Sequence, residues 1–444
     1  MSTGDDPQFA DGPAGRADDY AATGGRSIAG PSVLVPPASG GKAIKRRKSR
    51  RRRRGPVYAS NGWASGSNPP LDPVNGHANG AGADGAAEPA AGAIAVAPIV
   101  APSLRERAHG PLYAALDLGT NNCRLLVATP RDYGFRVVDA FSRIVRLGEG
   151  IGANGCLGEA AMARAIEALG VCSSKLAEHD VRRTRLIATE ACRSADNGAD
   201  FIARVRAETG LQLEVVSRET EARLAVAGCA SLVDPNATGV LLFDIGGGSS
   251  ELVWIDLTPA PDGRRRRMAD RIRTWMSLPV GVVSISERHG GRHVSPGTFA
   301  DMVAEVSEML TDFPEVEALD RAVAGGGIHM LGTSGTVTTL AGIHLGLPRY
   351  DRRRVDGTWL AGNMVADLIQ TLVGMDYETR MANPCIGRER ADLVLAGCAI
   401  LEAIRQRWPC DRLRVADRGL REGMLVELMA EDGRWHPRPR RRAP

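Results

Sequence analysis

Residues 241–253, LLFDIGGGSSELV, combine residue types that phosphate chemistry uses. An apolar run ends at Asp244, and Glu251 lies seven residues later. Between the two acids lie three consecutive glycines, Gly246, Gly247 and Gly248, and two serines, Ser249 and Ser250. Bare glycine backbone lets N–H groups approach an oxyanion, and a hydroxyl adds a donor. A divalent cation bridging phosphate and carboxylate would account for the two acids. The alternative is a plain tight turn whose acids bind the turn amides.

An earlier stretch, residues 112–127, repeats this pattern. Its acid, Asp117, precedes Asp244 by 127 residues (244 minus 117). The donors that follow it are Gly119, Thr120, Asn121 and Asn122. Where the later stretch has Glu251, the earlier one has Arg124. Two matching hairpins predict two equivalent halves that face each other across a cleft, with a phosphate-binding side and a cation-binding side.

Two further residues are candidates for the same chemistry. Arg193, in IATEACRSADN (187–197), carries a guanidinium fork that matches phosphate oxygens, although an arginine ending a surface helix is an equal alternative. Glu221, in RETEARL (218–224), lies in the first turn of a predicted helix. Hydrolysis of a phosphoanhydride needs a group that orients or deprotonates water, which a carboxylate there can do. An acid that only complements the helix dipole is the alternative.

The elements around these residues alternate between strand and helix patterns. Strand patterns cover 114–119, 124–129, 135–147, 184–189 and 213–217, and helical spacing covers 159–178, 199–209 and 219–232. Hairpin strands mixed with crossover helices predict an α/β fold.

Composition divides the 444 residues into a tail and a body. Residues 1–108 are rich in Gly, Ala, Pro and Ser, which predicts a disordered arm. Lys42 and the run 45–54 hold ten positive charges, so a net charge of +4 leaves the rest near −6. The basic run either only solvates the arm or binds a polyanion. Scattered cysteines, no apolar span for a bilayer and no signal peptide predict a cytoplasmic protein without membrane contact.

Taken together, the motifs resemble those of the exopolyphosphatase and guanosine-pentaphosphate phosphohydrolase family. They are DLGTNN (117–122), ATEACRSADN (188–197), RETEARL (218–224), DIGGGSSEL (244–252), GTSGT (332–336) and LRVADRGLREGMLVE (413–427). The resemblance implies two actin-like (ribonuclease H-like) domains of the sugar kinase and chaperone ATPase superfamily. We expect domain I at 109–217, completed by the helix 418–432, domain II at 218–417, and a disordered basic tail at 433–444.

The resemblance also implies roles for single residues. It makes Glu221 the catalytic base and assigns Mg²⁺, or another divalent cation, to Asp244, Glu251 and Asp117. The phosphate-binding loops are then 117–122 and 246–249, with Arg124 and Arg193 as additional phosphate ligands. This chain departs from the family pattern at Cys123, which we expect to be buried, and at Arg418, where a glycine is usual.

The predicted function is release of terminal orthophosphate from inorganic polyphosphate. Hydrolysis of guanosine pentaphosphate is the close alternative. A polyphosphate- or RNA-binding regulator without turnover, and a superfamily kinase or ATPase, are the alternatives of other classes. The oligomeric state stays open, a homodimer included. The GTSGT motif at 332–336 either contacts a nucleotide or closes the sheet of the second domain.

Overall fold

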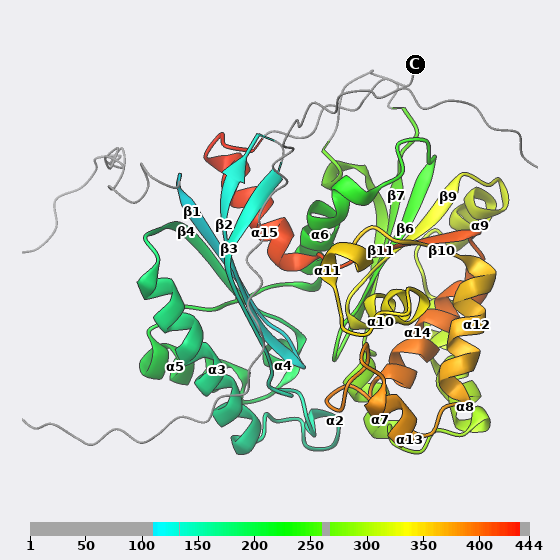
Figure 1. Cartoon of the computed structure of the whole chain (residues 1–444), viewed down its shortest axis with the longest axis horizontal. Coiled ribbons are helices and arrows are strands. Elements are labelled where there is room, and N and C mark those ends of the chain that lie inside the picture. The colour runs from blue at the N-terminus through cyan, green and yellow to red at the C-terminus, as the bar shows by residue number, and fades with distance from the viewer. Residues whose placement is uncertain (1–109, 133, 260–266, 436–444) are drawn as a thin grey trace, which may run out of the picture. The chain divides into compact units, whose positions relative to one another are not determined.

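The computed structural model describes residues 110–132, 134–259 and 267–435, which build two mixed β-sheets covered by helices (Figure 1). All of them belong to one compact unit of the chain. The predicted arm at 1–108 with its basic run lies outside the described residues. The predicted tail at 433–444 does so too, apart from its first three residues.

The first sheet has five strands in the order β3-β2-β1-β4-β5. They are β1 (Leu112–Leu118), β2 (Asn122–Arg131), β3 (Gly134–Ile144), β4 (Val181–Ala188) and β5 (Glu214–Val215). The first three form an antiparallel meander, and β4 and β5 continue the sheet in parallel. The hairpin predicted around Asp117 is thus β1–β2, at the centre of the sheet.

The second sheet repeats this order and adds one strand, as β10-β11-β9-β6-β7-β8. Its members are β6 (Gly239–Ile245), β7 (Ser250–Asp256), β8 (Ile272–Leu278), β9 (Ile328–Thr333), β10 (Trp359–Ala361) and β11 (Arg412–Ala416). Here β6, β7 and β8 form the meander, β9 and β11 continue in parallel, and β10 closes the edge. The duplicated order confirms the predicted α/β class with two actin-like halves.

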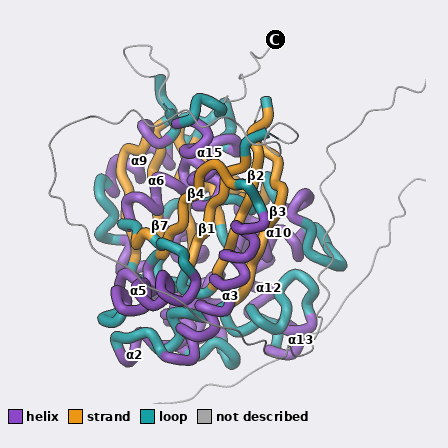
Figure 2. The backbone as a smooth tube through the Cα atoms, turned by 90° about the vertical axis from the view of Figure 1, so that its left-hand side faces the viewer, coloured by secondary structure: helices purple, strands orange, loops and turns teal. Residues whose placement is uncertain are grey.

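Helices cover both sheets because each strand alternates its apolar side chains between two faces. In β1, Ala114 and Leu116 pack with α3 (Glu159–Glu178) and α5 (Gly198–Thr209), which lie in front of the sheet in Figure 2. The other face, with Tyr113 and Ala115, packs on α15. Cys123 is buried at the end of the hairpin, as predicted. The helix predicted at 159–178 coincides with α3.

The remaining helices lie mainly around the second sheet. They are α2 (Ile151–Asn154), α4 (Glu190–Ser194), α6 (Arg218–Cys229), α7 (Val282–His289), α8 (Pro296–Leu310), α9 (Val316–Ala324), α10 (Gly335–His344), α11 (Arg352–Val355), α12 (Gly362–Val373), α13 (Tyr377–Ala382), α14 (Val394–Arg407) and α15 (Leu420–Glu431). Buried side chains of α8, α10, α12 and α14 form the largest core against β6, β7 and β9. None of the helices in the described part is long and apolar enough to cross a membrane.

Helices α6 and α15 lie side by side between the two sheets (Figure 1). Their backbones approach very closely, because a Cβ on Gly228 would lie 3.0 Å from Gly423 N, and a Cβ on Gly423 would lie 3.1 Å from Leu224 Cα. Helix α6 covers the inner face of the second sheet and α15 that of the first. Each crossing helix therefore brings its N-terminal turn to the region between the two hairpins.

Candidate active site

The two hairpin loops share one turn geometry. Gly119 N donates to Asn122 O at 2.8 Å, and Gly246 N donates to Ser249 O at 2.9 Å. The repeat seen in the sequence is therefore a repeat of backbone structure. Both turns end a buried strand pair, so each loop is held by the centre of its own sheet.

The two loops meet each other directly. A Cβ added to Gly247 would lie 2.9 Å from Thr120 Cβ and 3.2 Å from Asn121 N. One added to Gly248 would lie 2.9 Å from Thr120 Oγ1. Any side chain at these two glycines would push the loops apart, which explains why the sequence leaves them bare. The structure thus brings the two predicted phosphate loops to one place.

The acids of the hairpins lie on the inner faces of their sheets. Asp117 is the cross-strand partner of Arg124, and Asp244 is the cross-strand partner of Glu251. Directly opposite residues of an antiparallel pair share a face and contact each other. The first hairpin therefore carries a carboxylate beside a guanidinium cation, and the second carries two carboxyl groups side by side. Like charges placed this way repel, so the second pair needs protons or a cation.

Burial intensifies this repulsion in the second hairpin. Burial, together with the charges of Glu251 and Asp117, raises the pKa of Asp244 to about 7. The pKa of Glu251 is also raised by burial, although two hydroxyls oppose the shift. Ser249 Oγ donates to Glu251 Oε1 at 2.8 Å, and Ser277 Oγ donates to the same oxygen at 3.0 Å. The hydroxyl predicted to donate to phosphate thus orients Glu251 here.

These residues fit a divalent cation in their chemistry. Carboxylate and amide oxygens are the donors that Mg²⁺ prefers, and Mg²⁺ is often held by only one or two carboxylates together with substrate phosphate. The buried Oδ1 atoms of Asn121 and Asn122 have no hydrogen-bond partner. Over the described residues, no three Asp, Glu, His or Cys side chains are already grouped as a metal site. Of the three acids predicted to bind a cation, Asp244 and Glu251 lie directly opposite each other on one hairpin. Asp117 acts on Asp244 from the facing hairpin.

Glu221 is the fourth residue of α6. The side chain of Ser217 caps the N-terminus of this helix by accepting a hydrogen bond from Thr220 N. Its side chain is buried beside the second hairpin. Burial and the charge of Glu251 raise its pKa to about 9, against the opposing effect of Arg193. Without a bound cation Glu221 therefore holds a proton at neutral pH, and a cation held by Asp244 and Glu251 would lower its pKa and make it a proton acceptor. The burial of Glu221 distinguishes it from Glu219, the exposed acid of the same helix turn.

Arg193 is held on both sides by carboxylates. Its Nη1 donates to Glu221 Oε1 at 2.6 Å and to Val216 O at 2.5 Å, and its other nitrogens bind Glu190. Arg218 Nη2 donates to the same Glu190 at 2.7 Å. Arg193 is therefore no free surface arginine, because four of its five N–H groups are used and only one Nη2–H is left for a phosphate oxygen.

Glu190 is a site residue that sequence reasoning missed. A Cβ on Gly248 would lie 3.1 Å from its Cγ, so Glu190 abuts the second loop. Burial alone would raise its pKa, but hydrogen bonds from Arg218 and Arg193 outweigh burial and lower it. In the sequence Glu190 follows Thr189 in the ATEACR motif, where nothing distinguishes it from an ordinary acid at the start of a helix. Only its three-dimensional contacts identify it.

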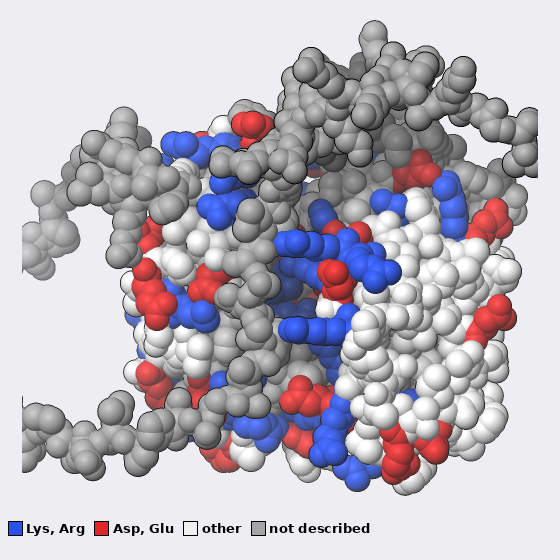
Figure 3. All heavy atoms as spheres, in the orientation of Figure 1, with Lys and Arg blue, Asp and Glu red and all other residues white. Residues whose placement is uncertain are grey.

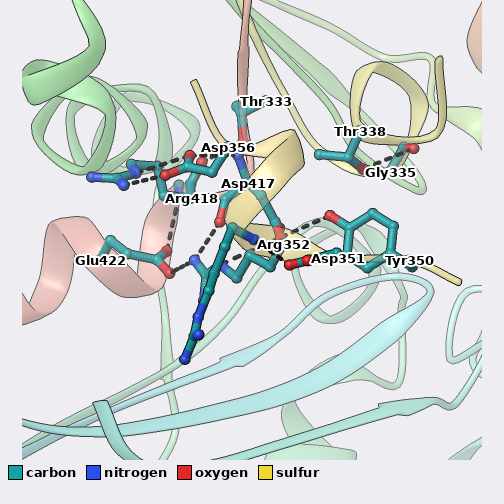
Figure 4. Close-up of polar contacts among 12 residues, drawn as sticks. Thr333, Gly335, Thr338, Tyr350, Asp351, Arg352, Asp356, Asp417, Arg418 and Glu422 are labelled. Atoms are coloured by element: carbon teal, nitrogen blue, oxygen red, sulfur yellow. Dashed lines mark hydrogen bonds and ion pairs between the residues drawn. The ribbon is translucent and has the colours of Figure 1, made fainter. Parts of the chain in front are cut away.

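A second arginine–glutamate pair, with a buried glutamate and a partly exposed arginine, lies at the start of α15 (Figure 4). Arg352 Nη2 donates to Glu422 Oε1 at 2.6 Å, and Gly419 N donates to Glu422 Oε2 at 2.9 Å. Arg352 also binds Asp417, whose carboxylate accepts from Tyr350. Figure 3 shows Lys and Arg side chains gathered around the position of α11, the helix that carries Arg352.

The same cluster explains why Arg418 can stand where the family usually has glycine. Arg418 Nε donates to Asp356 Oδ1 at 3.1 Å, and its carbonyl accepts from Thr333 Oγ1 at 2.6 Å. Its φ is not positive, so the position does not require glycine. The GTSGT motif, to which Thr333 belongs, ends β9 and begins α10, with Ser334 at φ 92° and its hydroxyl buried without a partner. Thr333 of the motif thus links the end of β9 to Arg418, just before α15, and the two alternatives for the motif's role stay open.

The fold and this set of facing loops define a phosphate-handling member of the actin-like class. A family model described as the Ppx/GppA phosphatase family matches residues 126–432. Because this match spans more than half of the chain, the chain belongs to the Ppx/GppA phosphatase family.

Individual relatives agree with this membership. Exopolyphosphatase 2 of Mycobacterium tuberculosis is 28% identical over 334 residues, covering 71% of this chain and 98% of that protein. A guanosine-5'-triphosphate,3'-diphosphate pyrophosphatase of Aeromonas salmonicida is 28% identical over 325 residues, covering 73% and 60% of the two chains. Among solved structures, an Aquifex aeolicus Ppx/GppA family member is 27% identical, with a TM-score of 0.58 and coverage of 72% and 98%. An exopolyphosphatase-like protein is 27% identical with a TM-score of 0.64, covering 72% and 99%.

Proposed function

We propose that this protein is an exopolyphosphatase, which releases terminal orthophosphate from inorganic polyphosphate with the help of a divalent cation. The observation that carries the proposal is the position of Glu221, a buried carboxyl group of raised pKa beside the point where two glycine loops meet. Family membership supports the reaction class. The match to the relative named exopolyphosphatase covers 98% of that relative's length. Intact acids on both hairpins oppose the reading as a regulator without turnover.

In this proposal the chain's own residues divide the work. Glu221 accepts the proton of the attacking water, and Arg193 orients Glu221 before substrate arrives. Backbone N–H groups of 117–122 and 246–249 hold phosphoryl oxygens, and Arg124 adds positive charge from the first hairpin. Asp244, Glu251 and Asp117 hold Mg²⁺ or a similar cation, which when bound neutralises charge on the phosphoryl group.

Guanosine pentaphosphate is the second candidate substrate. A relative named for a guanosine substrate is as similar to this chain, at 28% identity, as the exopolyphosphatase is. Both substrates end in a phosphoanhydride, so one site chemistry serves either. The chain spans only 60% of that relative's length, against 98% for the exopolyphosphatase, which favours polyphosphate as the first choice.

The test is phosphate release from both substrates by wild type, Glu221→Gln and Glu219→Gln. Glu219 is exposed and lies two residues before Glu221 on the same helix, so its variant controls for the loss of one negative charge. Losing a general base costs about 10²- to 10⁴-fold in rate. We expect that loss in Glu221→Gln alone. Equal rates in the two variants would remove the assignment of the base, and no release by wild type from either substrate would overturn the function.

The basic arm, the cytoplasmic location and a possible homodimer stay predictions. The arm's role is tested by comparing the binding of long polyphosphate with and without residues 1–108 at several salt concentrations. A polyanion-binding arm releases counterions, so its contribution must fall steeply as salt rises. Unchanged affinity on removal of the arm would contradict this role.

A further inference from the structure

We propose that Arg421, together with Arg124, forms a clamp for the penultimate phosphoryl group of the substrate. Nothing in the motifs assigned a role to Arg421. The inference deepens the proposed function and rests on it, because it names the subsite that holds the leaving group. Three observations carry it: the placement of Arg421 over the first hairpin, the lack of a partner for either guanidinium, and the charges around them.

Helix α15 places Arg421 over the face that carries Asp117. Leu425 and Leu428 lie four and seven residues after Arg421, so the three share one stripe of the helix. Both leucines are buried against the inner face of the first sheet, in the cluster that includes Tyr113. Asp117 lies on that same face by strand alternation, and Arg124 is its cross-strand partner. Arg421 therefore lies over the face that carries Asp117, in the first turn of α15, which begins beside Asp244 of the second hairpin.

Within the described ranges, neither the Arg421 nor the Arg124 guanidinium has a hydrogen-bonding or ion-pair partner, although the charge of Arg421 acts on Glu422 over a longer distance. The nearest acid along the helix, Glu422, gives its two oxygens to Arg352 and to Gly419 N. By contrast, Arg193 is bound by two carboxylates. Both Arg421 and Arg124 are only partly buried, so an anion can reach their free N–H groups, and a guanidinium fork matches phosphate oxygens.

The charges around the pair favour an anion. Burial lowers the pKa of Arg421; the charge of Glu422 opposes this shift, whereas Arg124 and Arg352 add to it. Asp117 is the other acid that acts on both arginines. A phosphoryl group would relieve the repulsion between Arg421 and Arg124, and a planar fork can bind two of its oxygens.

The position of the pair relative to Glu221 assigns the phosphoryl group. Water attacks the terminal phosphorus beside Glu221, which takes the proton, and a new P–O bond forms. The bond from that phosphorus to the bridging oxygen breaks, and the oxygen leaves with its electron pair on the shortened chain. The products are orthophosphate and polyphosphate one unit shorter. Asp117 of the first hairpin acts on Glu221 electrostatically, so the hairpin lies near the proton acceptor. In the proposal the leaving oxygen gains its charge on this side of the site, where two guanidinium groups stabilise it.

The experiment measures binding of tripolyphosphate by calorimetry to full-length Glu221→Gln protein, which turns over too slowly to interfere. Arg421→Met is added to this background, with Arg204→Met as the matched control. Arg204 is paired on the surface of α5, so its loss removes one charge far from the clamp. Charge-assisted hydrogen bonds predict a fall in affinity of about 10- to 100-fold for Arg421→Met. The control should change affinity less than about 2-fold.

Further variants separate binding from folding. Arg421→Lys keeps the charge without the fork and should give an intermediate affinity. If both arginines grip one group, Arg124→Met and Arg421→Met together should lose less than the sum of their separate effects. A folded Arg421→Met protein that binds tripolyphosphate within 2-fold of its parent would overturn the clamp. If wild type binds tripolyphosphate through Arg421 but releases no phosphate, the proposed function fails and the clamp stands.

Discussion

Two arginine–glutamate pairs lie at the starts of the two crossing helices, and their carboxyl groups behave in opposite ways. Arg193–Glu221 and Arg352–Glu422 have the same N–O distance, 2.6 Å. Yet the pKa of Glu221 is raised to about 9, whereas that of Glu422 is lowered to about 2.

The surroundings of each pair explain the difference. Burial would raise both pKa values. For Glu422 the effect of burial on the pKa is outweighed, because Arg421, Arg352 and the Gly419 N–H all stabilise its charge. Glu221 has Arg193, but Arg193 is shared with Glu190, and Glu251 and Asp117 repel its charge. An ion pair alone therefore does not decide the charge state of a buried acid. One glutamate is fixed as an anion that holds structure, and the other is free to exchange a proton.

The largest effect on stability should come from breaking the second pair. Glu422→Ala removes a buried carboxylate that accepts from Arg352 and from Gly419 N. Because the Arg352 side chain is 40% exposed and keeps its pair with Asp417, the cost is about 1–3 kcal/mol of unfolding free energy. Glu427→Ala, on the same helix, breaks only a half-exposed pair with Arg185 and should cost about 0–1 kcal/mol. Urea unfolding of both variants checks this. Equal losses would mean that Glu422 is no more structural than a surface acid.

The first pair should show itself in the pH dependence of stability. The pKa of Glu221 is about 9 when folded against an ordinary 4.5, so between these values the folded state holds the proton and the unfolded state does not. Wild-type stability should therefore fall as pH rises through this window. Glu221→Gln removes that loss, so it should exceed wild type by a margin that grows from pH 5 to pH 9. Urea unfolding at several pH values with a metal chelator measures the margin.

The outcome for Glu422 provides the contrast in the same experiment. Its lowered pKa means that its contribution is fully present above 4.5 and is lost only as pH falls toward 2. The loss caused by Glu422→Gln should thus stay constant from pH 5 to pH 9. A Glu221→Gln margin that is also constant, or that grows toward acid, would contradict the difference between the pairs.

The smallest effect should come from Glu190→Gln. This change frees Arg193 from one of its two acids, so Arg193 stabilises the charge of Glu221 more strongly and lowers its pKa. The acid limb of the pH–rate profile should move to lower pH, with a fall in rate of about tenfold from weaker positioning. Glu190→Asp should recover part of the rate. A fall in rate with an unmoved profile would mean that Glu190 only supports the fold.

Much of this arrangement could be read from residue patterns, because local features determine it. The hairpins, their glycines and the helix at 159–178 follow from short-range periodicity and turn chemistry. The strand predicted at 213–217 is reduced to β5, since only two of its residues pair with the edge of β4. Ser277 and Arg421 could not be found in this way. The first reaches Glu251 through the register of β7 and β8, and the second reaches Asp117 through helix packing.

The glycine contact between α6 and α15 has a consequence for how variants are interpreted. Gly423 lies two residues after Arg421, and Leu224, which it touches, lies three residues after Glu221. A methyl group at Gly423 would separate the two backbones and so change the spacing between the proton acceptor and the anion clamp. Activity would then fall although no reacting atom is near the change, so a damaged variant there reports on the alignment of the halves and not on chemistry.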